Sequence, residues 1–87
     1  DFSARQVFIE KQEIELTHKE YELLRLLVEN VNNAVTREQL VNDIWESNIS
    51  AFDRTLDTHV KSLRKKIGIY SDNIITIRRV GYRFEIK

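Results

Sequence analysis

Basic and hydroxyl side chains recur at helical spacing in the second half of the chain. Successive residues of a helix are about 100° apart, so these side chains share the face opposite an apolar stripe. The polar face consists of Arg54, Thr55, Thr58, Lys61, Ser62 and Lys65. Cations neutralise the phosphates of duplex DNA, and short polar side chains reach base edges when a helix lies in the major groove. The pattern favours a DNA-binding helix, but a solvated polar face explains this helix equally well when it is taken alone.

The apolar stripe places this helix at residues 54–67. The stripe consists of Leu56, Val60, Leu63 and Ile67, at the spacing of one buried helix face. Asp53 is suited to cap the start of the helix, and Gly68 follows its end, where a left-handed residue commonly terminates a helix. Residues 46–52 have no sustained periodicity and are predicted to form a loop.

Two earlier helices are marked by capping boxes. The T-x-x-E sequence at residues 17–20 precedes apolar residues at three- and four-residue spacing, which predicts a helix that ends near residues 30–33. The T-x-x-Q sequence at residues 36–39 repeats the signal and predicts a short helix over about residues 37–45. The third helix is therefore expected to pack against two others.

Short alternating segments predict one hairpin near each end of the chain. Residues 6–10 and 13–16 are separated by a possible tight turn at Lys11 and Gln12, and residues 74–78 and 82–86 are joined through residues 79–81. Arg78 and Arg79 make the second hairpin basic at its tip. Arginine is favoured in a narrow minor groove, so this tip could reach DNA beside the helix, although a merely soluble turn is the alternative.

The net charge of the chain is zero, which by itself argues against general affinity for a polyanion. Its distribution is uneven. Residues 1–44 hold nine acidic and five basic side chains, a net charge of −4, and residues 45–87 hold five acidic and nine basic ones, a net charge of +4. This asymmetry points to a nucleic acid or an acidic surface as the partner of the second half.

Composition narrows the class of protein further. The 87 residues fit one domain, 1–87, and because Asp1 stands in place of an initiator methionine we expect a fragment of a longer protein. Cysteine is absent, which rules out disulfides and thiolate metal sites and is compatible with a cytosolic location. No apolar run approaches the ~20 residues of a membrane-spanning helix.

The sequence offers little to catalysis or to a cofactor. The two histidines, His18 and His59, lie on separate predicted helices without clustered acids or thiols, so no metal site is expected. The hydroxyls and acids form no nucleophile–base pattern, and two glycines cannot build a phosphate-cradling loop. Asp57 precedes Lys61 by one helical turn, and we expect it to orient Lys61.

Six segments that cover nearly the whole chain carry a family resemblance. They are LTHKEYELL at residues 16–24, TREQL at 36–40, IW at 44–45, RTLDTHV at 54–60, LRKKI at 63–67 and TIRRVGYRF at 76–84. Together they resemble the effector domain of the OmpR/PhoB family of bacterial two-component response regulators. The resemblance implies an α+β winged helix-turn-helix with an N-terminal antiparallel sheet, three helices and a C-terminal β-hairpin wing. It also implies a further strand or two, between residues 2 and 10 or between the first two helices.

The resemblance implies a function and its partners as well. These are sequence-specific binding of double-stranded DNA at direct repeats by a cytoplasmic transcription regulator, and a receiver domain ahead of Asp1 that a sensor kinase phosphorylates. Self-association of the full-length protein and contact of the loop at residues 46–52 with RNA polymerase are further implications.

The family's DNA contacts can be carried over residue by residue. Phosphate contacts are implied for Arg54, Thr55, His59, Lys61 and Arg64. Trp45 would pack near the DNA backbone, and Arg78 would enter the minor groove. Two positions depart from the family pattern. Ser62 stands where some relatives have an arginine that reads bases, and Arg79 replaces a glycine of the wing, where a Cβ disfavours positive φ.

A winged-helix module that binds an acidic protein partner is the alternative. Such a module has no need of Arg78 and Arg79 beside Lys61 and Lys65, and it would show no affinity for duplex DNA at low salt. An enzyme is a distant third possibility.

Overall fold

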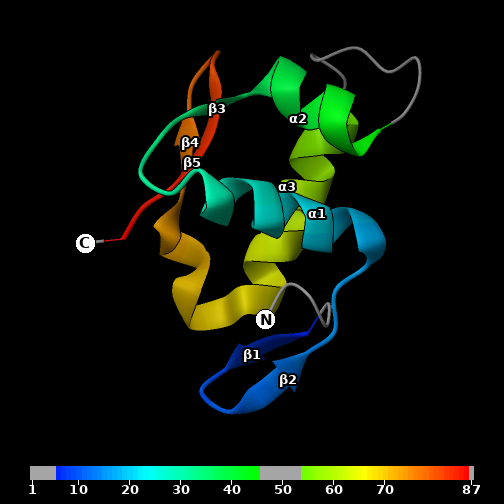
Figure 1. The fold of residues 1–87 in the computed structure, drawn as a ribbon, viewed down its shortest axis with the longest axis vertical. Helices are drawn as coiled ribbons and strands as arrows, with labels where there is room; N and C mark the ends of the chain where they lie inside the picture. The colour runs from blue at the N-terminus through cyan, green and yellow to red at the C-terminus, as the bar shows by residue number, and fades with distance from the viewer. Residues whose placement is uncertain (1–5, 46–53, 87) are drawn as a thin grey trace.

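The computed structural model describes residues 6–45 and 54–86, in which three α-helices and two small antiparallel sheets form the fold (Figure 1). The first sheet is the predicted N-terminal hairpin, with β1 at Val7–Ile9 and β2 at Gln12–Ile14. Its turn consists of Glu10 and Lys11, one residue earlier than predicted. Both have positive φ, 51° and 70°, as a two-residue turn matched to strand twist requires.

The first two helices begin at the predicted caps. Helix α1 spans His18–Glu29, and the Thr17 capping box is complete: the Thr17 hydroxyl accepts from the Glu20 amide, and the Glu20 carboxylate accepts from the Thr17 amide. Helix α2 spans Arg37–Ile44, and the hydroxyl of its N-cap, Thr36, accepts from the Gln39 amide at 3.1 Å. Both helix predictions are confirmed.

Helix α3 spans Arg54–Ile67, as predicted, and Gly68 after it has the expected left-handed φ of 56°. A 3₁₀ segment, η1, then spans Gly68–Asn73. It was not predicted, because its side chains are largely exposed and show no apolar period. The described residues contain no helix long and apolar enough to cross a membrane.

The second sheet has the strand order β3-β5-β4, with every pair antiparallel. Strands β4, Ile74–Ile77, and β5, Gly81–Phe84, form the predicted hairpin, called the wing below. Strand β3, Val35–Thr36, lies between α1 and α2, at one of the two places where the resemblance implied an additional strand. The segment ahead of residue 6 lies outside the described residues.

The sheet requires a glycine where β3 meets β5. A Cβ at Gly81 would lie 2.0 Å from the Val35 carbonyl oxygen and 3.0 Å from the Arg37 amide nitrogen. No side chain fits there, since the first of these distances is far below any van der Waals contact. The wing is thus pressed directly against the backbone that leads into α2.

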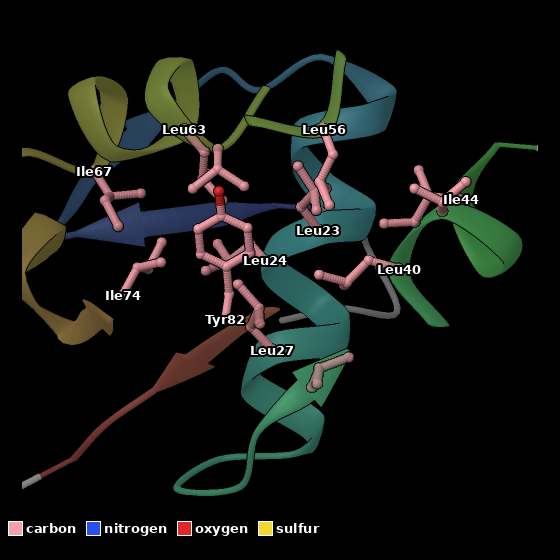
Figure 2. Close-up of a cluster of buried hydrophobic side chains, with 13 residues drawn as sticks. Leu23, Leu24, Leu27, Leu40, Ile44, Leu56, Leu63, Ile67, Ile74 and Tyr82 are labelled. Atoms are coloured by element: carbon pink, nitrogen blue, oxygen red, sulfur yellow. The ribbon is translucent and has the colours of Figure 1, made fainter. Parts of the chain in front are cut away.

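The core lies between the three helices and the inner side of the second sheet (Figure 2). Its buried members include Leu23, Leu24, Leu27, Val35, Leu40, Val41, Ile44, Leu56, Val60, Leu63, Ile67, Ile74 and Tyr82. All four residues of the predicted α3 stripe belong to it. The rotation of α3 inferred from apolar spacing is therefore confirmed.

Replacement of Leu63 by alanine should test this packing. Leu63 is fully buried, at 0% exposure, so Leu63→Ala should lower the free energy of unfolding by ~2–5 kcal/mol through lost contacts and a residual cavity. Lys65→Ala, two residues away on the exposed side, should leave it nearly unchanged. Urea denaturation of both variants measures the difference, and equal stabilities would contradict the packing.

Candidate nucleic-acid interface

The outward face of α3 carries five of the eleven predicted contact residues. Arg54, Thr58, Lys61 and Lys65 are exposed, and Thr55 is half-buried. An open pocket of about 370 Å³ lies on this face, lined by Arg54, Asp57, Thr58 and Lys61. The Thr58 hydroxyl donates to the Arg54 carbonyl oxygen at 3.0 Å, one turn earlier. Three cations and a hydroxyl are thus presented to solvent along one helix.

Ser62 does not lie on this outward face, and that part of the prediction is wrong. Its hydroxyl donates to the Glu20 carboxylate of α1 at 2.5 Å, and the residue is half-buried. Ser62 directly precedes the buried Leu63 and flanks the stripe on the side that α1 covers. In this structure the side chain binds the protein itself, so base reading by Ser62 stays a prediction without support from the geometry.

Glu20 is the buried acid that holds α3 against α1. Besides Ser62, its carboxylate accepts from the Lys66 ammonium at 2.7 Å and from the Thr17 amide at 2.9 Å. Burial alone would raise the pKa of Glu20, but these hydrogen bonds and the charge of Lys66 outweigh it and lower the pKa to about 2. The carboxylate is therefore ionised at neutral pH, and the hydrogen bonds that it accepts are strengthened by its charge.

Trp45 and His59 form a separate contact at the end of α2. Their rings meet edge to face, with centroids 5.1 Å apart. The Lys19 ammonium lies 5.4 Å from the Trp45 ring centroid and donates to the Ile44 carbonyl oxygen at 2.8 Å. The Nδ1 atom of His59 lies 2.8 Å from the Thr55 carbonyl oxygen. Trp45 is half-buried, so this arrangement fixes its ring beside α3.

Arg64 points toward the wing. Its Nη2 atom donates to the Ile74 carbonyl oxygen at 2.6 Å and to the Thr76 hydroxyl at 2.8 Å. Its guanidinium also lies 5.7 Å from the Tyr82 ring centroid. These contacts give Arg64 a role inside the protein, as a link from α3 to β4, that differs from the implied phosphate contact.

Asp57 contacts the wing and α2, and among the described residues no hydrogen bond or ion pair joins it to the predicted partner Lys61. The Arg37 guanidinium donates to both of its oxygens, at 2.7 and 3.1 Å, and the Tyr82 hydroxyl donates to one of them at 2.5 Å. The hydrogen bonds from Arg37 hold the pKa of Asp57 below its ordinary value. Burial, reinforced by the adjacent carboxylate, raises the pKa of Tyr82 to about 12. The expectation that Asp57 orients Lys61 is replaced by a contact across 20 residues of sequence.

The wing tip presents two exposed arginines, Arg78 and Arg79. Arg79 has a φ of 67°, so it adopts the left-handed conformation that its Cβ disfavours. The surrounding hydrogen bonds hold it there: the Val80 amide donates to the Ile77 carbonyl oxygen at 2.9 Å, and the Arg37 amide donates to the Val80 carbonyl oxygen at 3.0 Å.

The predicted loop at 46–52 and the predicted cap Asp53 lie outside the described residues.

Sequence reasoning missed three functional contributions, those of Glu20, Arg37 and Tyr82. Glu20 was recognised only as half of a capping box, yet its carboxylate also joins α1 to α3. A hint was present, because Glu20 stands directly before the buried Tyr21, near the buried face of α1. Arg37 and Tyr82 are polar residues at an element start and in a strand, where pattern alone does not reveal a distant partner.

The arrangement defines a class of protein. A short helix followed by a longer one with an exposed cationic face, and then a hairpin with a basic tip, is the winged helix-turn-helix of nucleic-acid-binding domains. Comparison with known proteins agrees with this fold. The family model for the C-terminal domain of transcriptional regulatory proteins matches residues 11–84.

Individual relatives span the chain. The transcriptional regulatory protein SrrA of Staphylococcus aureus (strain NCTC 8325 / PS 47) is 43% identical over 91 aligned positions, which cover 100% of this chain and 38% of SrrA. The crystal structure of DrrB, an OmpR/PhoB homologue from Thermotoga maritima, superposes with a TM-score of 0.88 at 38% identity, covering 99% of this chain and 40% of DrrB. The DNA-binding domain of the response regulator AdeR, crystallised with an intercistronic region, has a TM-score of 0.86 at 31% identity, covering 100% of this chain and 92% of that domain.

The chain therefore belongs to the family of C-terminal domains of transcriptional regulatory proteins, in the OmpR/PhoB class of response regulators. This family consists of sequence-specific DNA-binding regulator domains and not of enzymes. The chain spans well under half the length of SrrA and DrrB.

Acid denaturation should reveal the Glu20 contacts. The pKa of Glu20 falls from 4.5 to about 2 on folding, so its contribution is complete above pH 4.5 and is lost as the pH drops toward 2. That contribution is about 3 kcal/mol, from 1.36 kcal/mol per pKa unit. In Glu20→Gln the loss of unfolding free energy between these pH values should be smaller by about this amount. Glu13→Gln, an exposed control on β2, should keep the wild-type pH dependence; an unchanged profile for Glu20→Gln would contradict the assignment.

Glycine at position 79 should stabilise the domain. A left-handed conformation costs a non-glycine residue about 1–2 kcal/mol, and part of this is offset because glycine has a larger unfolded-state entropy. Arg79→Gly should raise the free energy of unfolding by about 0.5–1 kcal/mol. Arg78→Gly, at a neighbour without positive φ, should lower it instead. Thermal denaturation gives the melting temperature of each variant. A shift of both melting temperatures in the same direction would contradict the assigned turn.

Proposed function

We propose that this domain binds double-stranded DNA with α3 in the major groove and with Arg78 in the adjacent minor groove. The observation that carries the proposal is the common position of the two cationic surfaces. The first turns of α3 and the wing are joined through Asp57 and Tyr82, and the wing tip is hydrogen-bonded to the start of α2. The wing tip and the start of α3 accordingly lie toward the same end of the molecule, away from the β1–β2 hairpin (Figure 1).

The contact residues divide by role. Arg54, Lys61 and Lys65 would neutralise phosphates on either side of the major groove, and Thr55 and Thr58 are short enough to approach base edges. Arg78 and Arg79 would meet the strongly negative minor groove. His59 and Trp45 would pack beside the DNA backbone at the N-terminal half of α3. Arg64 contributes by holding the wing.

The assignments that concern the whole protein rest on its relatives. We propose that the domain follows a receiver domain, as the length of SrrA and DrrB beyond the matched part suggests. A sensor kinase would phosphorylate that receiver, and the full-length protein would self-associate on direct-repeat half-sites in the cytoplasm. Contact of residues 46–52 with RNA polymerase is proposed from the family resemblance alone.

Selection from random duplexes tests DNA recognition directly. The domain is incubated with a random duplex pool, bound molecules are amplified and sequenced, and enrichment of one motif, repeated at a fixed spacing with the full-length protein, is the expected result. The control replaces both Lys61 and Lys65 with alanine, which leaves the core intact and should abolish enrichment. Failure of the wild-type domain to enrich any motif, together with binding to an acidic protein, would favour the protein-binding alternative.

The salt dependence of binding counts the phosphates neutralised. Five exposed cations lie on the proposed DNA-binding surface, namely Arg54, Lys61, Lys65, Arg78 and Arg79. The slope of log K against log salt should therefore be about −4 to −5, and Lys61→Ala should reduce its magnitude by about one. Lys11→Ala, at the turn of the β1–β2 hairpin, should leave the slope unchanged. Titration by fluorescence anisotropy at several salt concentrations gives the slope, and a value near zero would exclude the phosphate contacts.

A further inference from the structure

Three polar side chains from three elements meet between α3 and the wing. They are Arg37, the first residue of α2, Asp57 in the first turn of α3, and Tyr82 in β5, and we call them the wing junction. Asp57 is the centre, accepting two hydrogen bonds from Arg37 and one from Tyr82. Bidentate geometry fixes the angle between two planar groups as well as their distance, so the wing junction restrains both.

The restraint continues to the wing tip. The amide of Arg37 donates to the Val80 carbonyl oxygen at 3.0 Å, two residues from Arg78. Arg37 thus holds α3 with its side chain and the wing turn with its backbone. At the other end of the wing, Arg64 binds β4 through Ile74 and Thr76. The hairpin is therefore attached to α3 at both ends and has little freedom to tilt.

A substitution at Tyr82 can distinguish a positioning role from direct contact with DNA. Its side chain is buried, with 4% of the residue exposed, so it cannot touch a duplex laid against the outer face of α3. Its ring packs in the hydrophobic core, and a phenylalanine would pack in the same place (Figure 2). Only the hydroxyl reaches Asp57. Removal of that one oxygen therefore loosens the wing junction while the core stays filled.

We infer that the wing junction sets the distance between the α3 surface and Arg78, and that Tyr82 is a positioning residue for the minor-groove contact. This inference rests on the proposed function, because it assigns a role only if Arg78 touches DNA. A fixed distance matters because an arginine held at the groove loses little conformational entropy on binding, whereas one on a loose hairpin must be ordered first. Loosening the wing junction should accordingly weaken the contribution of Arg78 in particular.

A double-mutant cycle measures this coupling. Affinity for one selected duplex is determined for the wild type, Arg78→Ala, Tyr82→Phe and the double variant, at a temperature where thermal denaturation shows all four to be folded. In the wild-type background Arg78→Ala should weaken binding about tenfold. In the Tyr82→Phe background it should weaken binding about threefold or less, because the contact is already partly lost. A loss of stability alone would leave the two ratios equal.

A second variant and a control complete the test. Arg37→Lys keeps the charge and the backbone hydrogen bond to Val80 but removes the bidentate contact, and it should reduce the Arg78 effect in the same way. Tyr70→Phe, which removes a hydroxyl from the exposed η1 segment, should leave the tenfold effect intact. Equal Arg78 effects in the wild-type, Tyr82→Phe and Arg37→Lys backgrounds would overturn the positioning role alone. An Arg78→Ala variant that binds as tightly as the wild type would overturn the minor-groove contact itself, and the inference with it.

Discussion

The narrowness of the apolar stripe on α3 is the constraint on which the rest of the structure depends. Four residues bury one face of the helix, and the opposite face stays open to solvent. The two flanks between these faces are therefore held by polar contacts. Glu20 binds Ser62 and Lys66 on the α1 side, and the wing is bound through Asp57 and Arg64 on the other. These contacts also decide which cations of α3 are engaged within the protein: Lys66 binds Glu20 and Arg64 binds β4, whereas Arg54, Lys61 and Lys65 lie on the outward face.

Local sequence signals were sufficient for the helices and the wing. Capping residues, apolar spacing and the glycine after α3 act over a few residues, so the bounds of α1, α2 and α3 could be predicted closely. The predicted position of Ser62 and the predicted partner of Asp57 were wrong for a physical reason. Periodicity gives the angle of a side chain around its helix axis but not the neighbour that covers that angle. The partners of Ser62 and Asp57 are 42 and 20 residues away in the sequence.

The two elements that were not predicted from periodicity depend on their surroundings. Strand β3 has only two residues, too few for an alternating pattern, and exists because β5 pairs with it beside Gly81. The η1 segment lacks a buried face of its own, and contacts with the end of α3 and with β4 define its path. The family resemblance anticipated β3 because it carries tertiary information that the spacing of residues in one sequence does not.

The strand order β3-β5-β4 also bears on how the chain acquires its structure during synthesis. The central strand, β5, is the last of the three to leave the ribosome, and both outer strands are hydrogen-bonded only to it within this sheet. Until residues 81–84 emerge, β3 and β4 have no strand to pair with, although the three helices are already outside. Strand β3, in the link between α1 and α2, therefore gains its pairing partner only when the wing is complete. The surface formed by α3 and the wing is therefore complete only after β5 has paired with β3 and β4.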